Sequence, residues 1–187
     1  GNGGWDTMNG LEGNDTLKGG DGNDKLEGGS GNDSIAGDAG DDTLTDEAGN
    51  DILNGGLGDD TMTGGNGSDA YYVNSFGDFV IETNAALSTG GVDTVTSSIH
   101  YWLVDNVEKL ILSSVAAING TGNNLGNTII GNKAANMLSG YGGSDIICGG
   151  LGRDIMSGGD GYDDFDFNVI SETGKTSTTR DQITDFV

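Results

Sequence analysis

Apolar side chains recur at every ninth residue through the first 72 residues of the chain. Most stand in a polar–apolar–polar triplet, such as Thr16-Leu17-Lys18 or Lys25-Leu26-Glu27. Alternation of this kind places the middle side chain in a core and its two neighbours in solvent. The pattern therefore predicts one very short β-strand in every nine-residue row. The apolar residues, at the eighth position of each row, are Met8, Leu17, Leu26, Ile35, Leu44, Leu53, Met62 and Tyr71.

The residues between the triplets have the composition of tight turns. In every row of this region the fourth position is Gly and the sixth is Asp. Gly, Asn and Asp tolerate the left-handed backbone conformation that such turns need. The complete Gly and Asp columns favour an ordered repeat over a disordered acidic linker. A second alternative is a structural solenoid that binds no metal. The Gly column is Gly4, Gly13, Gly22, Gly31, Gly40, Gly49, Gly58 and Gly67, and the Asp column is Asp6, Asp15, Asp24, Asp33, Asp42, Asp51, Asp60 and Asp69.

Individual rows resemble a known repeat family. The rows GGDGNDKLE (19–27), GGSGNDSIA (28–36) and GGLGDDTMT (55–63) are similar to the RTX family, the haemolysin-type calcium-binding repeats of bacterial secreted proteins. The resemblance implies an all-β fold, a parallel β-roll (β-solenoid) with two rows per turn and calcium held in the turns. Two rows per turn would stack Met8, Leu26 and Leu44 in one sheet and Leu17 and Ile35 in the facing one.

Burial of apolar surface alone does not explain how such a coil stays folded. Hydrophobic residues make up 33% of the chain, and each turn of two rows buries only two large side chains. The entropy cost of ordering a whole turn exceeds what those side chains contribute. Asp side chains two rows apart would also lie about 4.8 Å from each other, a spacing at which like charges repel. A cation between them reverses this repulsion, and so we expect the repeat to need a metal ion.

The ligands on offer predict which cation this is. Carboxylates and backbone carbonyls in flexible Gly-rich turns suit Ca²⁺, whereas Mg²⁺ prefers a tighter octahedron. Zn²⁺ and Cu²⁺ favour His or Cys, of which the chain has one each, His100 and Cys148. We therefore predict Ca²⁺, bound by the sixth-position carboxylates and by backbone carbonyls of the turns. Pairing rows n and n+2 gives about six sites in residues 1–72, namely Asp6 with Asp24, Asp15 with Asp33, Asp24 with Asp42, Asp33 with Asp51, Asp42 with Asp60, and Asp51 with Asp69.

The second half of the chain repeats less regularly. From Tyr71 to about Thr121 the nine-residue phase disappears, and short β-type runs such as Phe79-Val80-Ile81 replace it. We interpret residues 73–121 as an irregular β spacer that joins a first β-roll block, residues 1–72, to a second, residues 122–166. Residues 167–187 leave the repeat and resemble the start of the flank that follows RTX rolls.

The five rows of the second block differ in charge at the sixth position. Asp145, Asp154 and Asp163 keep the carboxylate, and Asp145 with Asp163 makes one full site. Asn127 and Asn136 replace Asp in the first two rows. They predict weaker sites, Asn127 with Asp145 and Asn136 with Asp154, because an amide oxygen lacks the charge. We expect one to three Ca²⁺ ions in this block.

The second position of the row raises a question of backbone strain. Leu11 and Glu47 stand there in rows 10–18 and 46–54, where the motif has Gly. If this position needs a positive φ, each of these side chains strains the backbone by about 1 kcal/mol or more, whereas Asp38 suits the position better. For the row that opens with Asp46-Glu47, the alternative is a loop that relaxes outward, with a weak or distorted calcium site.

Charge and motif content exclude several classes of function. The chain has 30 Asp and Glu against 7 Lys and Arg, and a formal charge of −23 repels nucleic acid. No apolar run reaches the ~20 residues that span a bilayer. A single His, a single Cys and the lack of any complete phosphate-loop or nucleophile motif predict that these residues are not an enzyme. A catalytic domain, if there is one, would lie outside them.

The RTX resemblance implies a function outside the bacterial cell. An unfolded chain would leave through a type I secretion apparatus and would then fold and gain stability by binding extracellular calcium. The charge of −23 agrees with this, because it keeps the metal-free chain extended. Two alternatives stay open, a non-catalytic module of a secreted alginate epimerase, protease or lipase, or a module of a surface adhesin, and either could contact a polysaccharide or a cell surface. The chain opens in mid-array without Met, and we interpret it as a fragment of a longer protein.

Overall fold

The structure is a computed structural model that describes residues 1–83, 90–166 and 180–185. These residues form short parallel β-strands joined by turns, and none of them is in a helix. The described part of the chain accordingly holds no helix that could cross a membrane. The chain divides into two compact units, unit 1 with residues Gly1–Val95 and unit 2 with residues Thr96–Val187.

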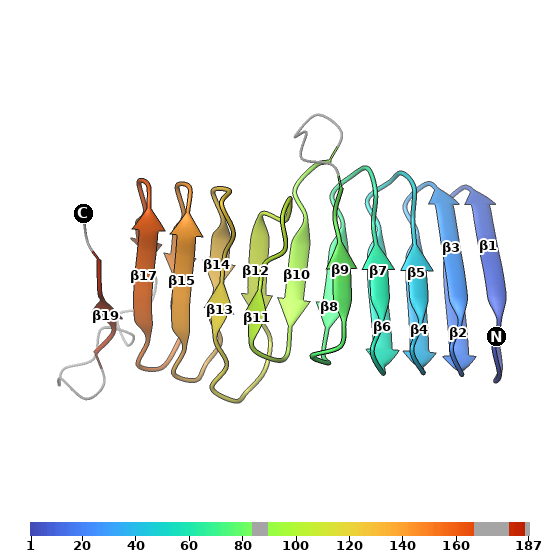
Figure 1. Cartoon of the computed structure of the whole chain (residues 1–187), viewed down its shortest axis with the longest axis horizontal. Coiled ribbons are helices and arrows are strands. Elements are labelled where there is room, and N and C mark those ends of the chain that lie inside the picture. The colour runs from blue at the N-terminus through green and yellow to red at the C-terminus, as the bar shows by residue number, and fades with distance from the viewer. Residues whose placement is uncertain (84–89, 167–179, 186–187) are drawn as a thin grey trace. The chain divides into compact units, whose positions relative to one another are not determined.

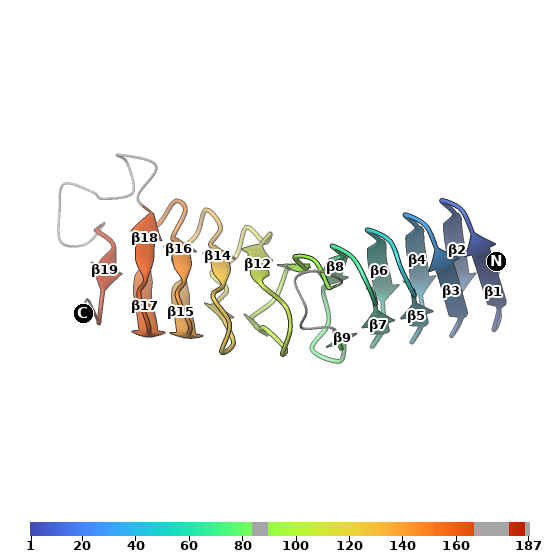
Figure 2. The same cartoon turned by 90° about the horizontal axis from the view of Figure 1, so that it is seen from above.

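Unit 1 is a parallel β-solenoid in which successive strands alternate between two sheets (Figure 1 and Figure 2). Each strand pairs in parallel with the strand two rows further on, so that Leu26 lies opposite both Met8 and Leu44. This register confirms the predicted parallel β-roll with two rows per turn. One sheet contains β1 (Thr7–Glu12), β3 (Lys25–Ser30), β5 (Thr43–Thr45), β7 (Thr61–Thr63) and β9 (Phe79–Ile81), and the other contains β2 (Thr16–Asp21), β4 (Ser34–Ala39), β6 (Ile52–Leu57) and β8 (Ala70–Val73).

The core of unit 1 consists of the eighth-position side chains. They point inward because they are the middle residues of polar–apolar–polar triplets, as in β7, where Met62 is buried between two less buried Thr. Met8 and Leu17 are only partly buried, since a neighbouring turn covers them on one side only. The fully buried members are Leu26, Leu44 and Met62 from one sheet and Ile35, Leu53 and Tyr71 from the other.

Unit 2 repeats the same arrangement with a less regular first turn. Its apolar stack is Leu110, Ile129 and Ile147 in one sheet and Leu138 and Met156 in the other. One sheet contains β11 (Tyr101–Trp102), β13 (Gly120–Thr121), β15 (Met137–Gly142), β17 (Ile155–Asp160) and β19 (Gln182–Ile183), and the other contains β12 (Lys109–Leu112), β14 (Thr128–Ile130), β16 (Ile146–Cys148) and β18 (Asp164–Asp166). β10 (Thr94–Ser97) spans the boundary between the two units.

The nine-residue phase extends beyond Tyr71, where we expected it to end. Val80 in β9 lies opposite Met62, and Asp78 stands 18 residues after Asp60. A second row follows after six additional residues and places Asp93 and Val95 at the sixth and eighth positions. These rows escaped notice because the first lacks Gly at its fourth position and the second is displaced by the insertion. Of the predicted C-terminal flank, residues 167–179 and 186–187 lie outside the described residues, and β19 pairs with β17.

The turn backbone answers the question about the second position. Leu11, Asp38 and Tyr141 have φ values of 79°, 75° and 80°, as Gly does at this position in other rows. The strained conformation expected at Leu11 is therefore present. The strain expected at Glu47 is not, because Glu47 is not among the residues with positive φ. Strand β5 instead ends at Thr45, and the chain follows a different path through Asp46 and Glu47. This path buries Asp46 in the turn, so the loop does not relax outward as the alternative expected.

Candidate metal centres in the turns

The sixth-position Asp side chains lie in two columns along unit 1, one for each line of turns. Within a column each carboxylate contacts the backbone of the preceding Asp, because its Oδ1 accepts a hydrogen bond from the N–H of the Asp two rows earlier. Asp42 Oδ1 accepts from Asp24 N at 2.7 Å and Asp60 Oδ1 from Asp42 N at 2.8 Å. In the other column Asp51 Oδ1 accepts from Asp33 N at 2.8 Å. The pairs that the sequence predicted are thus neighbours in the structure.

The second oxygen of these carboxylates, Oδ2, has no hydrogen-bond partner and is fully buried. It points into the turn above the first Gly of its own row. A Cβ added to Gly10 would lie 2.6 Å from Asp15 Oδ2 and 2.7 Å from the backbone O of Gly28, two rows later. We call this space, bounded by the Asp Oδ2 and that carbonyl oxygen, a cradle. Among the described residues, those with an unpartnered Oδ2 include Asp15, Asp24, Asp33, Asp42, Asp46, Asp51, Asp60, Asp69 and Asp145.

Burial makes these carboxylates poor acids. Desolvation is the largest cause and raises the pKa of Asp60 to about 6, that of Asp69 to about 7 and that of Asp145 to about 6, while the backbone hydrogen bond to Oδ1 opposes the shift. The pKa values of Asp42 and Asp51 are raised for the same reason. A buried carboxylate that lacks a partner requires either a proton or a cation.

The donor set of a cradle fits calcium. It offers carboxylate and backbone oxygens and neither nitrogen nor sulfur, which is the chemistry of a hard divalent cation. His100 is engaged elsewhere, because its Nδ1 accepts a hydrogen bond from the backbone N–H of Asn119. Cys148 ends strand β16. A Cβ at the first position would intrude on the cradle, which explains why that position is usually Gly.

Comparison with known families reaches the same assignment. The family described as RTX calcium-binding nonapeptide repeat (4 copies) matches residues 1–35, 36–71 and 121–156, which together make up more than half of the chain. The chain belongs to this family. No curated protein and no solved structure matches it. The RTX rows make this region a calcium-binding module, and the buried acidic clusters are places that could hold metal ions.

In the RTX rows of Asn127 and Asn136, hydrogen bonds within the protein satisfy the sixth-position side chain without a cation. Asn127 Nδ2 donates to the backbone O of Val107 at 3.1 Å, and its Oδ1 accepts from Asn123 N at 2.7 Å. Asn136 Nδ2 likewise donates to the backbone O of Ile118, and its Oδ1 accepts from Asn132 N. The preceding turn presents carbonyl oxygens to these residues, and the amide of Asn can donate to them whereas an ionised carboxylate cannot.

The predicted Asp ligands at the ends of the columns are less enclosed than the others. Asp6, Asp15 and Asp163 are only partly buried, whereas Asp145 and Asp154 are 1% and 0% exposed. Asp163 Oδ1 still accepts from Asp145 N at 3.0 Å, so the pair expected to form a full site is in contact. In the other column Asp154 N donates to Asp181 Oδ1 at 2.9 Å. This hydrogen bond extends the column of Asn136 and Asp154 into the C-terminal flank.

Sequence reasoning missed several acidic residues that occupy turn positions. Asp78, Asp93 and Asp181 accept the hydrogen bond that a sixth-position Asp accepts elsewhere. Each opens an Asp-x-apolar triplet, Asp78-Phe79-Val80 for example, and a search for that triplet without the Gly column would have found all three. Asp46 and Glu82 were missed as well, since each stands at the first position of a row, where the motif has Gly.

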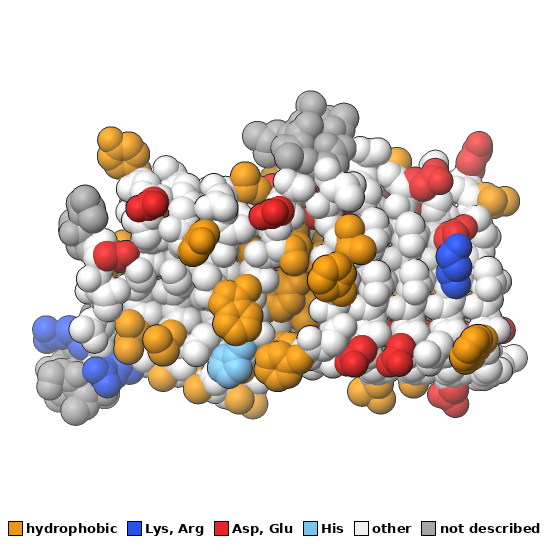
Figure 3. All heavy atoms as spheres, in the orientation of Figure 1, with side chains coloured by type: hydrophobic (Ala, Val, Ile, Leu, Met, Phe, Trp, Pro, Cys, Tyr) orange, Lys and Arg blue, Asp and Glu red, His pale blue; other side chains and the backbone are white. Residues whose placement is uncertain are grey.

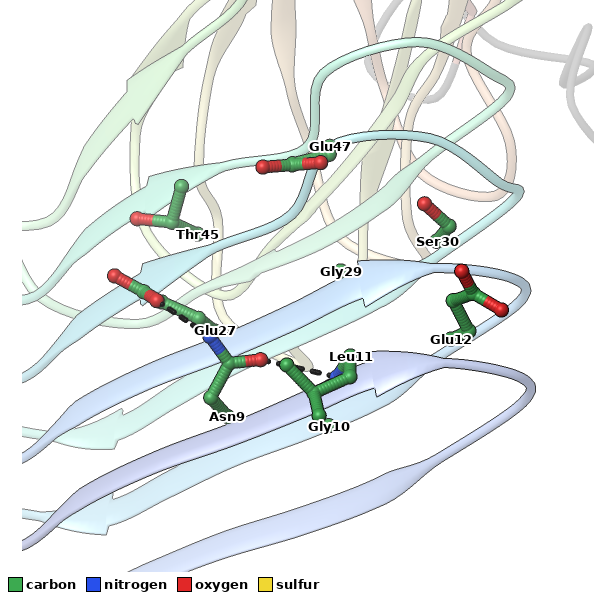
Figure 4. A pocket seen from close by; sticks show the side chains of 9 residues that line it. All are labelled: Asn9, Gly10, Leu11, Glu12, Glu27, Gly29, Ser30, Thr45 and Glu47. Atoms are coloured by element: carbon green, nitrogen blue, oxygen red, sulfur yellow. Dashed lines mark hydrogen bonds between the residues drawn. The ribbon is translucent and has the colours of Figure 1, made fainter.

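The exposed surface differs in its chemistry from the cradles. A groove in unit 1 is lined by Asn9, Leu11, Glu12, Glu27 and Glu47 (Figure 4). Lys25 Nζ donates to Glu27 Oε1 at 2.6 Å and holds the pKa of Glu27 below its usual range. Figure 3 shows only scattered acidic side chains on the face that it displays, although the chain has 30 Asp and Glu. The sixth-position carboxylates, in contrast, are mostly buried.

Proposed function

We propose that calcium drives the folding of this RTX β-roll and stabilises it. The observation that supports this most strongly is the row of buried Asp Oδ2 atoms without a hydrogen-bond partner. Leaving such groups unsatisfied is costly, more so when they are charged and stacked on one another. Bound Ca²⁺ would supply positive charge and several coordination positions at each cradle.

The residues of the chain have distinct roles in this proposal. Sixth-position Asp side chains supply the anionic ligands, and the hydrogen bond to each Oδ1 fixes the carboxylate so that Oδ2 faces the cradle. The first-position carbonyl two rows later supplies a neutral oxygen. Each interior Asp contacts both of its neighbours in the column, so that binding at one cradle orders the next. We propose about six ions in residues 1–72 and one to three in residues 122–166.

Isothermal titration calorimetry of the chelator-treated chain tests calcium binding directly. The proposal predicts several Ca²⁺ ions per chain and at most weak binding of Mg²⁺, which demands a tighter octahedron. A chain that binds one ion or none would overturn it. The same titration with Asp41→Asn, which removes a surface carboxylate while keeping its oxygen for Asp59 N, should give an unchanged stoichiometry.

We further propose that the parent protein is bacterial, extracellular and exported by type I secretion. We also propose a first block of residues 1–72, a spacer of residues 73–121 whose first part keeps the rows of Asp78 and Asp93, a second block of residues 122–166 and a flank of residues 167–187. Membership of the RTX family supports this, because these repeats are characteristic of secreted bacterial proteins. The alternatives remain a non-catalytic module of a secreted enzyme and a module of an adhesin. Export of a tagged chain that stops when the secretion apparatus is deleted would support the route, and glycan-array binding would favour the alternatives.

A further inference from the structure

Two acidic residues occupy the first position of their rows in unit 1. Asp46 follows the sixth-position Asp33 by 13 residues, and Glu82 follows the sixth-position Asp69 by the same interval. In ordinary rows the residue at this place is Gly, and its backbone O bounds the cradle of the earlier Asp, as Gly28 O does for Asp15. Both acids are buried, with exposed fractions of 4% for Asp46 and 6% for Glu82.

At Asp46 a carboxylate stands where a carbonyl stands in other cradles. The atoms nearest to a Cβ added at Gly28 are Asp46 Oδ2 and, at 2.5 Å, Asp33 Oδ2, with no backbone oxygen among the nearest three. Asp46 Oδ1 accepts from Gly29 N at 3.0 Å and from Glu47 N at 2.8 Å, which leaves Oδ2 without a partner. The altered path of the backbone at Asp46 and Glu47 is what brings this side chain into the turn.

Glu82 also places a carboxylate at the first position of a row, and Tyr71 orients it. Tyr71 OH accepts from Gly64 N at 2.9 Å and donates to Glu82 Oε2 at 2.9 Å, which orients the Glu82 carboxylate. The nearest atoms to a Cβ added at Gly64 are Asp69 Oδ2 and Tyr71 OH. Asp69 is 1% exposed and its Oδ2 has no partner, so an unsatisfied oxygen lies on the side of the turn where Tyr71 holds Glu82.

Each first-position acid joins two sixth-position acids. Carboxylate oxygens of Asp33, Asp46 and Asp51 all lie within 4.8 Å of one another, and so do those of the set Asp69, Glu82 and Asp93. The two sets share one geometry, because Asp69 N donates to Asp93 Oδ1 at 2.8 Å just as Asp33 N donates to Asp51 Oδ1 at 2.8 Å. The interval from Asp69 to Asp93 is longer by six residues, and the ligand positions are nevertheless preserved.

We propose that Asp46 and Glu82 are cation ligands that convert two cradles into sites with three carboxylates, both selective for a hard cation such as Ca²⁺. The proposal deepens the calcium-binding function proposed above and depends on it. A third anionic oxygen raises the affinity for a divalent cation, because affinity at oxygen sites follows the number of charged ligands. These two sites therefore bind first when calcium is limiting, and ordering of unit 1 begins at them.

A third acid at a comparable place shows why position alone is insufficient. Asp185 follows β19, and its Oδ1 accepts from Gly158 N at 2.9 Å. Its Oδ2 accepts from Gly159 N at 2.9 Å and from Ser157 Oγ at 2.7 Å, so both oxygens are satisfied. Asp185 is a structural anchor, whereas Asp46 keeps an oxygen for a ligand.

Substitutions at Asp46 test the first site by calcium titration of the full chain. Asp46→Asn should weaken the tightest phase of binding by about tenfold or more. Asp46→Gly restores the motif, so it should fold in excess calcium and show the same loss. Asp41→Asn removes one exposed carboxylate from the same block and should leave that phase unchanged. Equal affinities for the wild type, Asp46→Asn and Asp46→Gly would overturn the proposal at this site.

Terbium luminescence tests the second site, because Tyr71 lies against Glu82 and can sensitise a bound Tb³⁺ ion. Glu82→Gln keeps an acceptor for Tyr71 OH. In this variant the Tb³⁺ affinity, measured from the tyrosine-sensitised signal, should fall by about tenfold or more. Asp41→Asn, which removes an exposed carboxylate and leaves Tyr71 untouched, should leave that signal unchanged. An unaltered signal in Glu82→Gln would overturn the assignment of Glu82. A wild-type chain that binds neither Ca²⁺ nor Tb³⁺ would instead contradict the proposed function itself.

Discussion

The turns around Asp24, Asp42 and Asp60 in unit 1 and those around Asn127 and Asn136 in unit 2 solve the same backbone problem differently. In both, a sixth-position side chain links its row to the turn two rows earlier. The Asp turns receive a backbone N–H on Oδ1 and leave Oδ2 unsatisfied. The Asn turns donate from Nδ2 to a backbone carbonyl and accept a backbone N–H on Oδ1.

The difference between the two regions amounts to one atom per row. The Asn amide has partners for both its donor and its acceptor, so the turn is stable without an ion. An Asp carboxylate instead leaves a buried charge that must be neutralised. A single roll can therefore contain turns that depend on calcium and turns that do not. The Asn rows stand where the preceding turn presents the carbonyls of Val107 and Ile118, which a carboxylate could not satisfy.

The largest effect is expected from neutralising an interior Asp. Asp42→Asn removes an anionic ligand at a residue that is linked to both neighbours in its column, because Asp42 Oδ1 accepts from Asp24 N and Asp42 N donates to Asp60 Oδ1. We expect the calcium stoichiometry to fall by about one ion and the affinity of the neighbouring cradles to fall by about tenfold. Calorimetric titration measures both quantities. Asp59→Asn, an exposed neighbour in the same block, is the control, and equal behaviour of the two variants would abolish the distinction between Asp cradles and surface acids.

The reverse exchange in unit 2 should also be damaging. Asn136→Asp removes the donor to Ile118 O and points a carboxylate oxygen at that carbonyl and at Asn132 Oδ1. Leaving these acceptors unpaired should destabilise the calcium-saturated protein by about 1–3 kcal/mol. Thermal unfolding in excess calcium gives this value. An unchanged melting temperature would mean that the amide hydrogen bonds do not hold this turn.

Lowering the pH should separate the two regions when calcium is absent. The pKa of Asp60 is raised to about 6 and that of Asp69 to about 7, so the folded state binds protons more tightly than the unfolded chain. Protonation stabilises these turns fully below the unfolded pKa, and the gain is lost as the pH rises through about 6 to 7. In chelator we expect hydrogen-exchange protection of the Asp turns at pH 5 and little at pH 7.5. The Asn side chains do not titrate, and a pH-dependent change confined to their turns would contradict this account.

The smallest effect concerns the backbone, where the two regions should behave alike. Leu11 in unit 1 and Tyr141 in unit 2 adopt φ values of 79° and 80° with exposed side chains. Leu11→Gly and Tyr141→Gly should each relieve strain of about 1 kcal/mol, partly offset by the entropy that Gly adds to the unfolded chain. Glu47→Gly is the matched control and should bring no such gain, because Glu47 has no positive φ. Thermal unfolding in saturating calcium ranks the three, and a gain confined to Glu47→Gly would overturn this interpretation of the turns.

The repeat allowed much of the fold to be predicted, because its three columns carry separate physical roles. The eighth-position side chains fixed the two-sheet register, as the pairing of Leu26 with Met8 and Leu44 shows. The sixth column located Asp24, Asp42 and their partners correctly in space. The positions of Asp78 and Asp93 could not be predicted in this way, because their rows lack the Gly column or follow an insertion.

The side-chain atoms of the turns were beyond what the pattern could predict. Nothing in the sequence says which oxygen of Asp42 receives a hydrogen bond, or that Asn127 finds a carbonyl at Val107. By the repeat motif, Asp46 is a departure from the expected Gly. In the structure, however, its carboxylate lies beside that of Asp33. These outcomes depend on how turns from rows far apart in sequence stack on one another.

The central claim is that buried, unpartnered carboxylates make the fold depend on calcium. Far-UV circular dichroism of the chain at pH 7.5, first in excess chelator and then through a Ca²⁺ titration, tests it most directly. The account predicts a largely disordered spectrum without calcium and a cooperative gain of β-structure as calcium is added, with no comparable change on adding Mg²⁺. A chain that shows its full β-spectrum in chelator at this pH would contradict it.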